Sequence, residues 1–215
     1  MKRSLVFVFV AVVFAASLAD VPSAPARFSI PDPCQSTATS AAGMHFICPA
    51  GDGDVLGDAG LTITVTVVVD QTPVPNIPPE DFWLIGCNDL ISLCGGANSI
   101  NATAPTDENG MTTITGTLAG SGCDAGVRVV VQGIVLGNGA CAPICLPIAT
   151  RSPDQKNPAG GPPDLLVSSA DFAFFGTSYE SPPKPYFACH DFAIPYGTIT
   201  LADFARFGAH YGHSC

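Results

Sequence analysis

The chain has 215 residues, of which 47% are apolar and only 12% are charged, and it carries 22 glycines and 20 prolines. This composition excludes a coiled coil or a large helical bundle, which are rich in alanine, leucine and charged residues. It also excludes wholesale disorder, because enough branched aliphatic residues and phenylalanines are present to build a core. The formal net charge of −10 disfavours nucleic-acid binding, because an acidic chain repels polyphosphate.

The first residues have the pattern of an export signal. Lys2 and Arg3 precede an apolar run over residues 5–16, which leads to Ala19. Such a positive start, short apolar stretch and small terminal residue are typical of a secretory signal peptide, and the run is shorter than the ~20 residues of a spanning helix. We expect a signal peptide over residues 1–19, a linker over 20–33, a secreted or cell-surface location and no membrane span in the mature chain.

The nine cysteines agree with export, because disulfides form in oxidising compartments. They lack the Cys-x-x-Cys spacing of a zinc knuckle, so disulfides are favoured over a metal. The odd count leaves one thiol over, which the sequence does not identify. The candidate local pairs are Cys34–Cys48, Cys87–Cys94, Cys123 with Cys141 or Cys145, and Cys189–Cys215.

Residues 34–150 have the pattern of a β-rich domain. Residues 61–69 and 111–118 alternate apolar side chains with threonine, which is the period-two pattern of half-buried strands, and residues 126–136 form a β-branched run. Clusters of glycine, proline, asparagine and aspartate separate these runs, with no helical pattern between them. We therefore predict a mainly β fold, an antiparallel β-sandwich.

Two segments of this region carry a resemblance. Residues 62–75, followed after a gap by residues 105–114, are similar to bacterial immunoglobulin-like domains, which pair a strand ending in Val-x-Asp-x-x-x-x-Pro with a later Thr-Asp-x-x-Gly turn and strand. The resemblance implies an Ig-like sandwich that serves as a structural or adhesive module. A hairpin with an Asp-x-Asn-Gly turn between any two strands would look similar.

A glycine-rich loop within the region, residues 51–58, carries Asp52, Asp54 and Asp58. Short acidic loops can hold Ca²⁺. Aspartate and glycine are also the residues that tight turns prefer. We interpret this loop as a solvated turn.

Two segments near the C-terminus are copies of one another. Residues 169–179 and 201–211 are identical at seven of eleven positions, at an offset of 32, which indicates a duplicated unit. In each copy three aromatic residues lie at i, i+3 and i+7, on one face of a predicted helix. These aromatics are Phe172, Phe175, Tyr179, Phe204, Phe207 and Tyr211. We expect two short helices that bury these faces against each other.

The loop before each helix carries spaced oxygen-bearing side chains. A calcium ion takes six to eight oxygens, and a loop that leads into a helix can supply them, with a carboxylate at its end. Residues 152–215 resemble the type I dockerin family, with the pattern Asp-x-Asn-x-Asp-Gly-x-Val/Ile-x-x-x-Asp-Phe. The resemblance implies a small α-helical domain with paired EF-hand-like Ca²⁺ loops, which docks onto a cohesin-like partner protein. Independently of the resemblance, the duplication gives each loop a β-branched residue, Val167 or Ile199, that can pair with its twin in the other loop.

Both loops depart from the family pattern. The first contains a proline- and glycine-rich insertion over residues 156–163, and the second lacks the expected Asn and Asp over residues 193–196. We expect a calcium site in the first loop and a weak site or relic in the second. The ligands implied for the first site are Asp154, Asn157, Asp164, Ser168 and Asp171. Those implied for the second site are Asp191, Thr200 and Asp203.

A capping box explains part of this pattern without any metal. In both Ser168-x-x-Asp171 and Thr200-x-x-Asp203 the hydroxyl caps a helix, and the carboxylate accepts a hydrogen bond from the backbone amide of the capping residue. This interpretation leaves Asp154, Asn157 and Asp164 unexplained.

No motif of an enzyme stands out. The sequence lacks a nucleophile elbow, a zinc-protease helix and a phosphate-binding loop, and any acidic chain offers paired carboxylates for glycosidase chemistry. Phe82 and Trp83 are favoured as core aromatics over a sugar-stacking platform. His190, His210 and His213 are favoured as surface histidines over a metal-binding trio.

The combined expectation is a secreted, non-catalytic binding or assembly protein whose dockerin-like tail mediates calcium-dependent protein–protein docking. The contact with the partner is assigned to the helix starts, at Ser169, Ala170, Leu201 and Ala202. One alternative is a purely structural cell-surface or filament protein, in which the degenerate repeat no longer binds metal. Another is an enzyme that handles polysaccharide.

Overall fold

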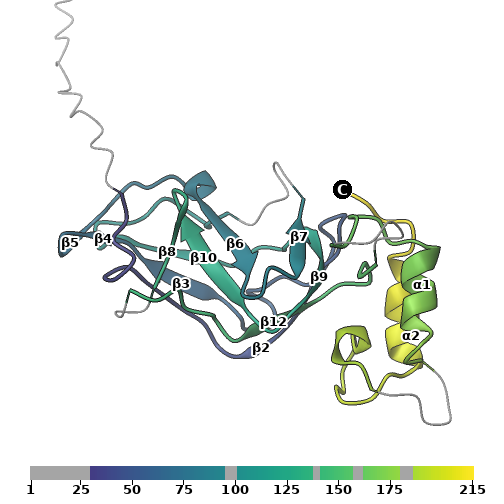
Figure 1. Ribbon diagram of the computed structural model, residues 1–215. Helices are drawn as coiled ribbons and strands as arrows, with labels where there is room; N and C mark the ends of the chain where they lie inside the picture. The colour runs from purple at the N-terminus through teal and green to yellow at the C-terminus, as the bar shows by residue number, and fades with distance from the viewer. Residues whose placement is uncertain (1–29, 95–100, 138–140, 157–161, 180–185) are drawn as a thin grey trace, which may run out of the picture.

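The computed structural model describes residues 30–94, 101–137, 141–156, 162–179 and 186–215. We call residues 30–151 the β region and residues 152–215 the tail. The predicted signal peptide and most of the predicted linker lie outside the described residues. The β region is elongated, and the two α-helices of the tail lie side by side at one end of it (Figure 1).

The strands of the β region form small and mostly antiparallel sheets, with the orders β1-β3-β8, β11-β10-β6 and β2-β12-β9-β7 and a β4-β5 ribbon. Their bounds are β1 Thr37–Thr39, β2 Gly43–Phe46, β3 Ile63–Thr66, β4 Val68–Val69, β5 Thr72–Pro73, β6 Phe82–Gly86, β7 Ile91–Leu93, β8 Met111–Ile114, β9 Gly120–Asp124, β10 Val127–Val131, β11 Ile134–Val135 and β12 Ile148–Arg151. A 3₁₀ turn, η1 (Pro79–Asp81), precedes β6. The prediction of a mainly β fold is confirmed.

Two details differ from the predicted strands. The β-branched run 126–136 is a hairpin, because Gln132 and Gly133 both have positive φ (50° and 85°), which is the backbone of a tight two-residue turn. Strand β12 pairs with β2 in parallel, where the sequence predicts antiparallel neighbours. Since β2 and β12 are far apart in the chain, no hairpin turn between them fixes their relative direction.

Alternation along the strands builds the core of the β region. In β3, Ile63 and Val65 are fully buried while the threonines between them are half-buried. In β6, Phe82 is buried and Trp83 is half-buried on the other face. The side chains of one face therefore form the main hydrophobic cluster, and the prediction of a core position is confirmed for Phe82.

The tail consists of helix α1 (Ser169–Phe175), the 3₁₀ turn η3 (Ala188–His190) and helix α2 (Leu201–Ala209). Phe175 and Phe207 are buried and stack on each other, with ring centroids 5.3 Å apart. Phe172 and Tyr211 remain exposed. Tyr179 stacks on Phe204, and Phe172 contacts the rings of Phe204 and Phe207. The predicted packing of the two aromatic faces is therefore confirmed, although it does not bury Phe172 and Tyr211.

The tail and the β region share a second hydrophobic cluster. Its buried members are Val167, Phe175, Phe192 and Phe207 from the tail, together with Phe46 and Cys48 from the β region. The guanidinium of Arg206 in α2 lies 4.0 Å above the ring of Phe46 and forms an ion pair with Asp54. The tail therefore completes its core on the β region.

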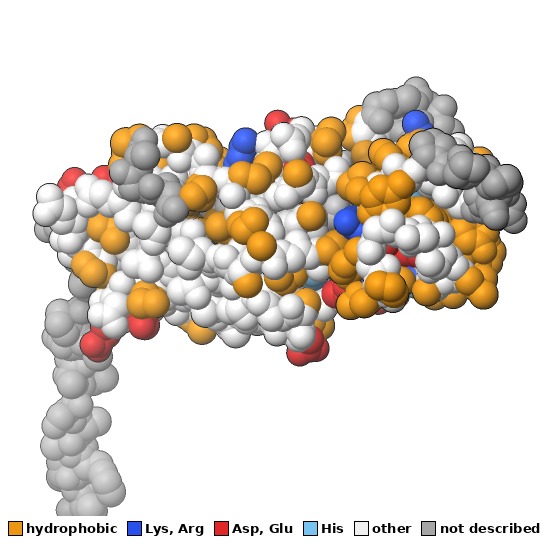
Figure 2. Space-filling model, turned by 90° about the horizontal axis from the view of Figure 1, so that it is seen from below, with side chains coloured by type: hydrophobic (Ala, Val, Ile, Leu, Met, Phe, Trp, Pro, Cys, Tyr) orange, Lys and Arg blue, Asp and Glu red, His pale blue; other side chains and the backbone are white. Residues whose placement is uncertain are grey.

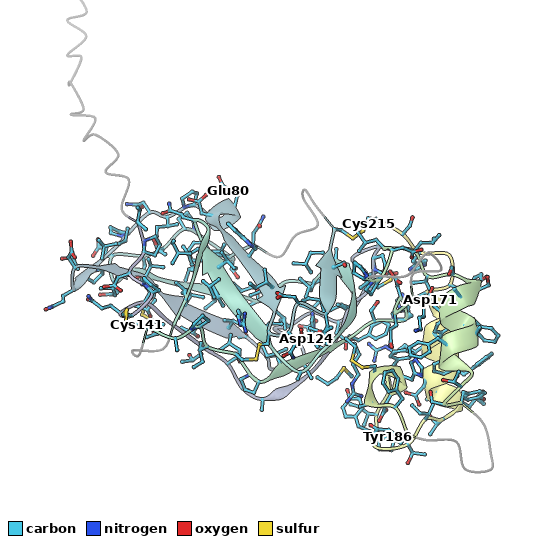
Figure 3. All side chains as sticks on the ribbon, in the orientation of Figure 1. Glu80, Asp124, Cys141, Asp171, Tyr186 and Cys215 are labelled. Carbon is cyan, nitrogen blue, oxygen red and sulfur yellow. A yellow bond between two sulfur atoms is a disulfide. The ribbon has the colours of Figure 1, made fainter. Side chains whose placement is uncertain are left out.

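Four disulfides are formed, Cys34–Cys141, Cys87–Cys145, Cys94–Cys215 and Cys123–Cys189, and Cys48 is a buried free thiol. The last two disulfides join the β region to the tail, and the bond to Cys215 is seen in Figure 3. Disulfides are thus confirmed, but every predicted local pairing is wrong. The reason is that pairing depends on which Cα atoms the folded chain brings together, and these need not belong to cysteines that are close in sequence.

Among the described residues, no helix is both long and apolar enough to pass through a membrane.

Candidate functional site

The loop before α1 folds back onto the start of its own helix. The amides of Gln155 and Lys156 donate to Oδ1 of Asp171, at 2.8 and 2.7 Å. The amide and hydroxyl of Ser168 donate to Oδ2 of the same residue, at 2.8 and 2.9 Å. The predicted capping box is therefore present, and Asp171 (Figure 3) holds residues 155–156 against the helix start despite the insertion that follows them.

The second copy repeats this arrangement. The amides of Phe192 and Ala193 donate to Oδ1 of Asp203, at 2.6 and 2.8 Å. The amide and hydroxyl of Thr200 donate to Oδ2 of Asp203, at 2.7 and 2.9 Å. The donors follow Asp191 by one and two positions, as Gln155 and Lys156 follow Asp154. The duplication seen in the sequence is therefore also a duplication of loop geometry, in which Asp154 and Asp191 hold equivalent places.

Asp154 is fully buried, and neither of its carboxylate oxygens accepts a hydrogen bond from the described residues. Burial, together with the nearby carboxylates of Asp171 and Asp164, raises the pKa of Asp154 to about 7. The hydroxyl of Ser121 and the backbone of Leu165 oppose that shift, but neither reaches hydrogen-bonding geometry. A buried carboxylate without a partner is costly unless it is neutralised by a proton or a cation.

Asp191 is equally buried, and although its Oδ1 atom has no hydrogen-bond partner among the described residues, its Oδ2 atom has partners from the protein. Its Oδ2 atom accepts hydrogen bonds from the hydroxyl of Tyr186, at 2.7 Å, and from the amide of Gly197. The guanidinium of Arg151 lies 3.8 Å from that oxygen and donates to the backbone carbonyl of Asp191. The second loop therefore carries a cation from its own chain at the place where the first loop has none among the described residues.

The remaining predicted ligands are spread around the first loop. Asp164 is exposed, Ser168 is committed to the capping box, and Asn157 lies outside the described residues. Leu165, which follows Asp164, has a positive φ of 64°. Gly197 in the second loop also has a positive φ, of 105°.

The expected pairing of Val167 with Ile199 is wrong at the backbone. The amide of Val167 donates to the carbonyl of His213, and its carbonyl accepts from the amide of Gly212. The segment after α2 therefore occupies the place expected for the second loop. The two positions still share the aromatic cluster, in which Val167 is buried and Ile199 packs against it.

The residues assigned to partner contact lie at the first turns of the two helices. Ser169, Leu201 and Ala202 are exposed and Ala170 is half-buried. Leu201 leaves 69% of its surface accessible, and Ile194 in the second loop leaves 77%. Figure 2 shows hydrophobic side chains gathered at the end of the molecule that the tail forms.

A different set of side chains converges most closely. Among the described residues, one group of His, Cys, Asp or Glu side chains brings its possible metal-ligand atoms within 4.8 Å of one another. This group consists of Cys48, Asp52, His210 and His213. The carboxylates of the predicted calcium loops do not meet that spacing. We call this group the Cys48 cluster.

The Cys48 cluster corrects several interpretations from the sequence. His210 and His213 are half-buried partners rather than free surface side chains, and Asp52 faces them rather than only solvent. His190 is fully buried, where its ring contacts the hydroxyl of Ser178, and burial lowers its pKa to about 4. The signals that could have located the cluster are the odd cysteine and the two histidines three residues apart.

Comparison of the chain with family models, with curated proteins and with solved structures finds no match. The resemblances to dockerins and to immunoglobulin-like domains therefore depend on the residues quoted above.

Proposed function

We propose that this chain is an exported, non-catalytic binding protein whose tail takes up one Ca²⁺ ion beside Asp154 and docks onto a partner protein through the starts of α1 and α2. The observation that carries the proposal is the contrast between Asp154 and Asp191. Both are fully buried at equivalent places in a duplicated loop, but within the described part of the chain only Asp191 has a cation and hydrogen-bond donors beside its carboxylate.

The chemistry around Asp154 favours a hard cation. The side chains near it are the carboxylates of Asp164 and Asp171 and the hydroxyl of Ser121, and oxygen ligands of this kind suit Ca²⁺. Asp171 already accepts four hydrogen bonds from protein donors, so its lone pairs are occupied. Binding of the ion would therefore depend on Asp154, on carbonyl oxygens and on movement of the exposed Asp164 carboxylate toward the helix start.

The docking step follows from where this loop lies. Its residues 155 and 156 hydrogen-bond to Asp171 within the first turn of α1, so an ion beside Asp154 would order the surface that carries Ser169 and Ala170. Leu201 and Ala202 present the corresponding first turn of α2. Four disulfides suit an extracellular protein, as this proposal requires.

Calcium titration of the full-length chain tests the first part of the proposal. We expect calorimetry to find one site, and Ca²⁺ to raise the melting temperature. An Asp154→Asn variant should lose both effects, whereas Asp58→Asn, which changes a carboxylate in another loop, should retain them. An unchanged response in Asp154→Asn, or no response in the wild-type chain, would refute calcium binding at this loop.

The docking part needs a separate measurement. Two variants at surface-exposed leucines, Leu201→Asp and the matched Leu166→Asp, would be used to capture secreted proteins. The amount captured by each variant would be compared in Ca²⁺ and in chelator. The proposal expects calcium-dependent capture that Leu201→Asp abolishes and Leu166→Asp retains, because only Leu201 lies in the first turn of a helix. Equal capture by both variants would place the contact elsewhere.

A purely structural role is the second candidate, and one observation favours it. Arg151 belongs to the β region and neutralises Asp191 in the tail, while two disulfides cross the same boundary. These contacts hold the tail in place without any added ion. Loss of the calcium response together with full stability in chelator would favour this role.

A further inference from the structure

We propose that the Cys48 cluster is a tetrahedral binding site for Zn²⁺ that joins the β region to the end of α2. The site lies outside the predicted calcium loops. The zinc proposal therefore does not depend on the proposed calcium-dependent docking. Cys48 and Asp52 come from the loop after β2, and His210 and His213 come from the C-terminal end of α2 and the turn that follows it.

The spacing of the ligand atoms carries the inference. The Nδ1 atom of His213 lies 3.4 Å from Sγ of Cys48 and 3.2 Å from Oδ2 of Asp52. The Nδ1 atom of His210 lies 3.4 Å from that of His213 and 3.4 Å from Oδ1 of Asp52. Atoms bound at ~2.0–2.3 Å around a tetrahedral zinc ion are ~3.3–3.8 Å from one another. The three separations from Nδ1 of His213 each join it to one ligand atom of another residue and are close to the edges of such a tetrahedron, and single ligand atoms of all four residues lie within 4.8 Å of one another.

Hydrogen bonding alone does not account for this convergence. The single Nδ1 atom of His213 faces a sulfur, a nitrogen and an oxygen at similar distances, but an imidazole nitrogen carries one hydrogen or one lone pair and serves one partner. A metal ion placed between them would satisfy all four groups at once.

The donor set indicates the metal. One thiolate, two imidazoles and one carboxylate are ligands that zinc accepts, and four protein ligands make a closed site of the structural kind. Calcium is disfavoured because it takes oxygen ligands. Binding would require the Cys48 thiol to release its proton to solvent, so that zinc uptake is accompanied by proton release.

The backbone holds the two histidines in place before any ion binds. The amide of His213 donates to the carbonyl of His210 at 3.1 Å, and Gly212 between them has a φ of 83° that turns the chain. The carbonyl of His213 accepts from Val167, which is buried in the tail. The site also explains the leftover thiol, because eight cysteines form disulfides and the ninth is Cys48.

Metal substitution of the full-length chain tests the proposal. After treatment with a zinc chelator, the chain should bind one equivalent of Zn²⁺ with release of protons. Co²⁺ should give the visible absorption of a tetrahedral ion together with a thiolate-to-cobalt charge-transfer band. Because the loss of an outer-shell partner already weakens a metal site 10–100-fold, Asp52→Asn should weaken zinc binding by about 100-fold or more.

Three variants make the result specific. Cys48→Ser should lose the charge-transfer band. Asp58→Asn, in the same acidic loop but outside the cluster, and Asp154→Asn, in the calcium loop, should both bind zinc like the wild type. Failure of the wild-type chain to bind stoichiometric zinc, or a cobalt spectrum unchanged in Cys48→Ser, would overturn the assignment. Cys48 is buried, so Cys48→Ser could fail to fold. Asp52 lies in an exposed loop, so we expect Asp52→Asn to fold, and its zinc affinity then tests the site.

Discussion

Arg151 and Asp191 form a buried ion pair across the boundary between the β region and the tail, with the guanidinium Nη1 atom 3.8 Å from Oδ2. Removing one partner of a buried pair leaves an uncompensated charge, which commonly costs about 3–5 kcal/mol. We therefore predict that Arg151→Met lowers the free energy of unfolding by about 3 kcal/mol, as measured by chemical denaturation.

The double variant provides the control for that pair. Arg151→Met combined with Asp191→Asn removes both charges and should recover much of the lost stability. If the single variant is as stable as the wild type, the pair does not neutralise Asp191, and the contrast between the two loops has a different origin.

A second prediction concerns pH. His45 is fully buried, and neither ring nitrogen has a hydrogen-bond partner among the described residues. Burial lowers its pKa from 6.5 to about 4, with Asp54 opposing the shift and Arg206 adding to it. Below pH 6.5 this histidine binds a proton in the unfolded chain but stays neutral in the folded chain. The free energy of unfolding therefore falls by ~3 kcal/mol as the pH drops from about 6.5 to about 4.

The measurement is the difference in unfolding free energy between the wild type and His45→Leu across that range. Asp154 titrates over overlapping pH values with the opposite sign, because its pKa is raised in the folded chain, and the difference removes its contribution. Parallel pH profiles for the two proteins would contradict the prediction.

The disulfide pattern is the third prediction. Peptide mapping of the unreduced, denatured chain should find alkylation at Cys48 alone and cross-linked peptides that join Cys94 to Cys215 and Cys123 to Cys189. Replacing both Cys94 and Cys215 by alanine should lower stability by about 4 kcal/mol, because that bond closes a sequence separation of 121 residues. A cross-link between neighbouring cysteines would contradict the fold as described.

The fourth prediction compares two phenylalanines of α1. Phe175 is fully buried between the ring of Phe207 and that of Phe192, whereas Phe172 is 45% exposed. Phe175→Ala should cost about 4 kcal/mol through lost burial and the cavity that remains. Phe172→Ala should cost much less. Similar losses in both variants would show that α1 is not packed through Phe175.

The sequence predicts those parts of the molecule that local patterns determine. Alternation places Ile63 and Val65 in the core, and the Ser168 and Thr200 hydroxyls begin helices because each is followed three residues later by an aspartate. The aromatic spacing likewise predicts that Phe175 and Phe207 meet. In each case the signal lies within one turn of helix or a few residues of strand.

The features that the sequence missed depend on distant segments. Cys48 and His213 are 165 residues apart in the chain, and Arg151 reaches Asp191 from outside the duplicated unit. No spacing rule connects such residues, since their meeting depends on how the tail sits against β12 and the loop after β2. The lost acidic ligands of the second loop could be read from the sequence, but the guanidinium at that site could not.

The shared aromatic cluster has a consequence for any attempt to use this tail elsewhere. Phe46 is an internal side chain of the cluster around Phe192 and Phe207, although it belongs to the β region. A fragment cut at residue 152 would lose that ring, two cross-linked cysteine partners and the cation beside Asp191. If the duplicated helices were fused to another protein, they would expose the aromatic surface that Phe46 covers here. The tail therefore cannot be transferred to another protein as an independent unit.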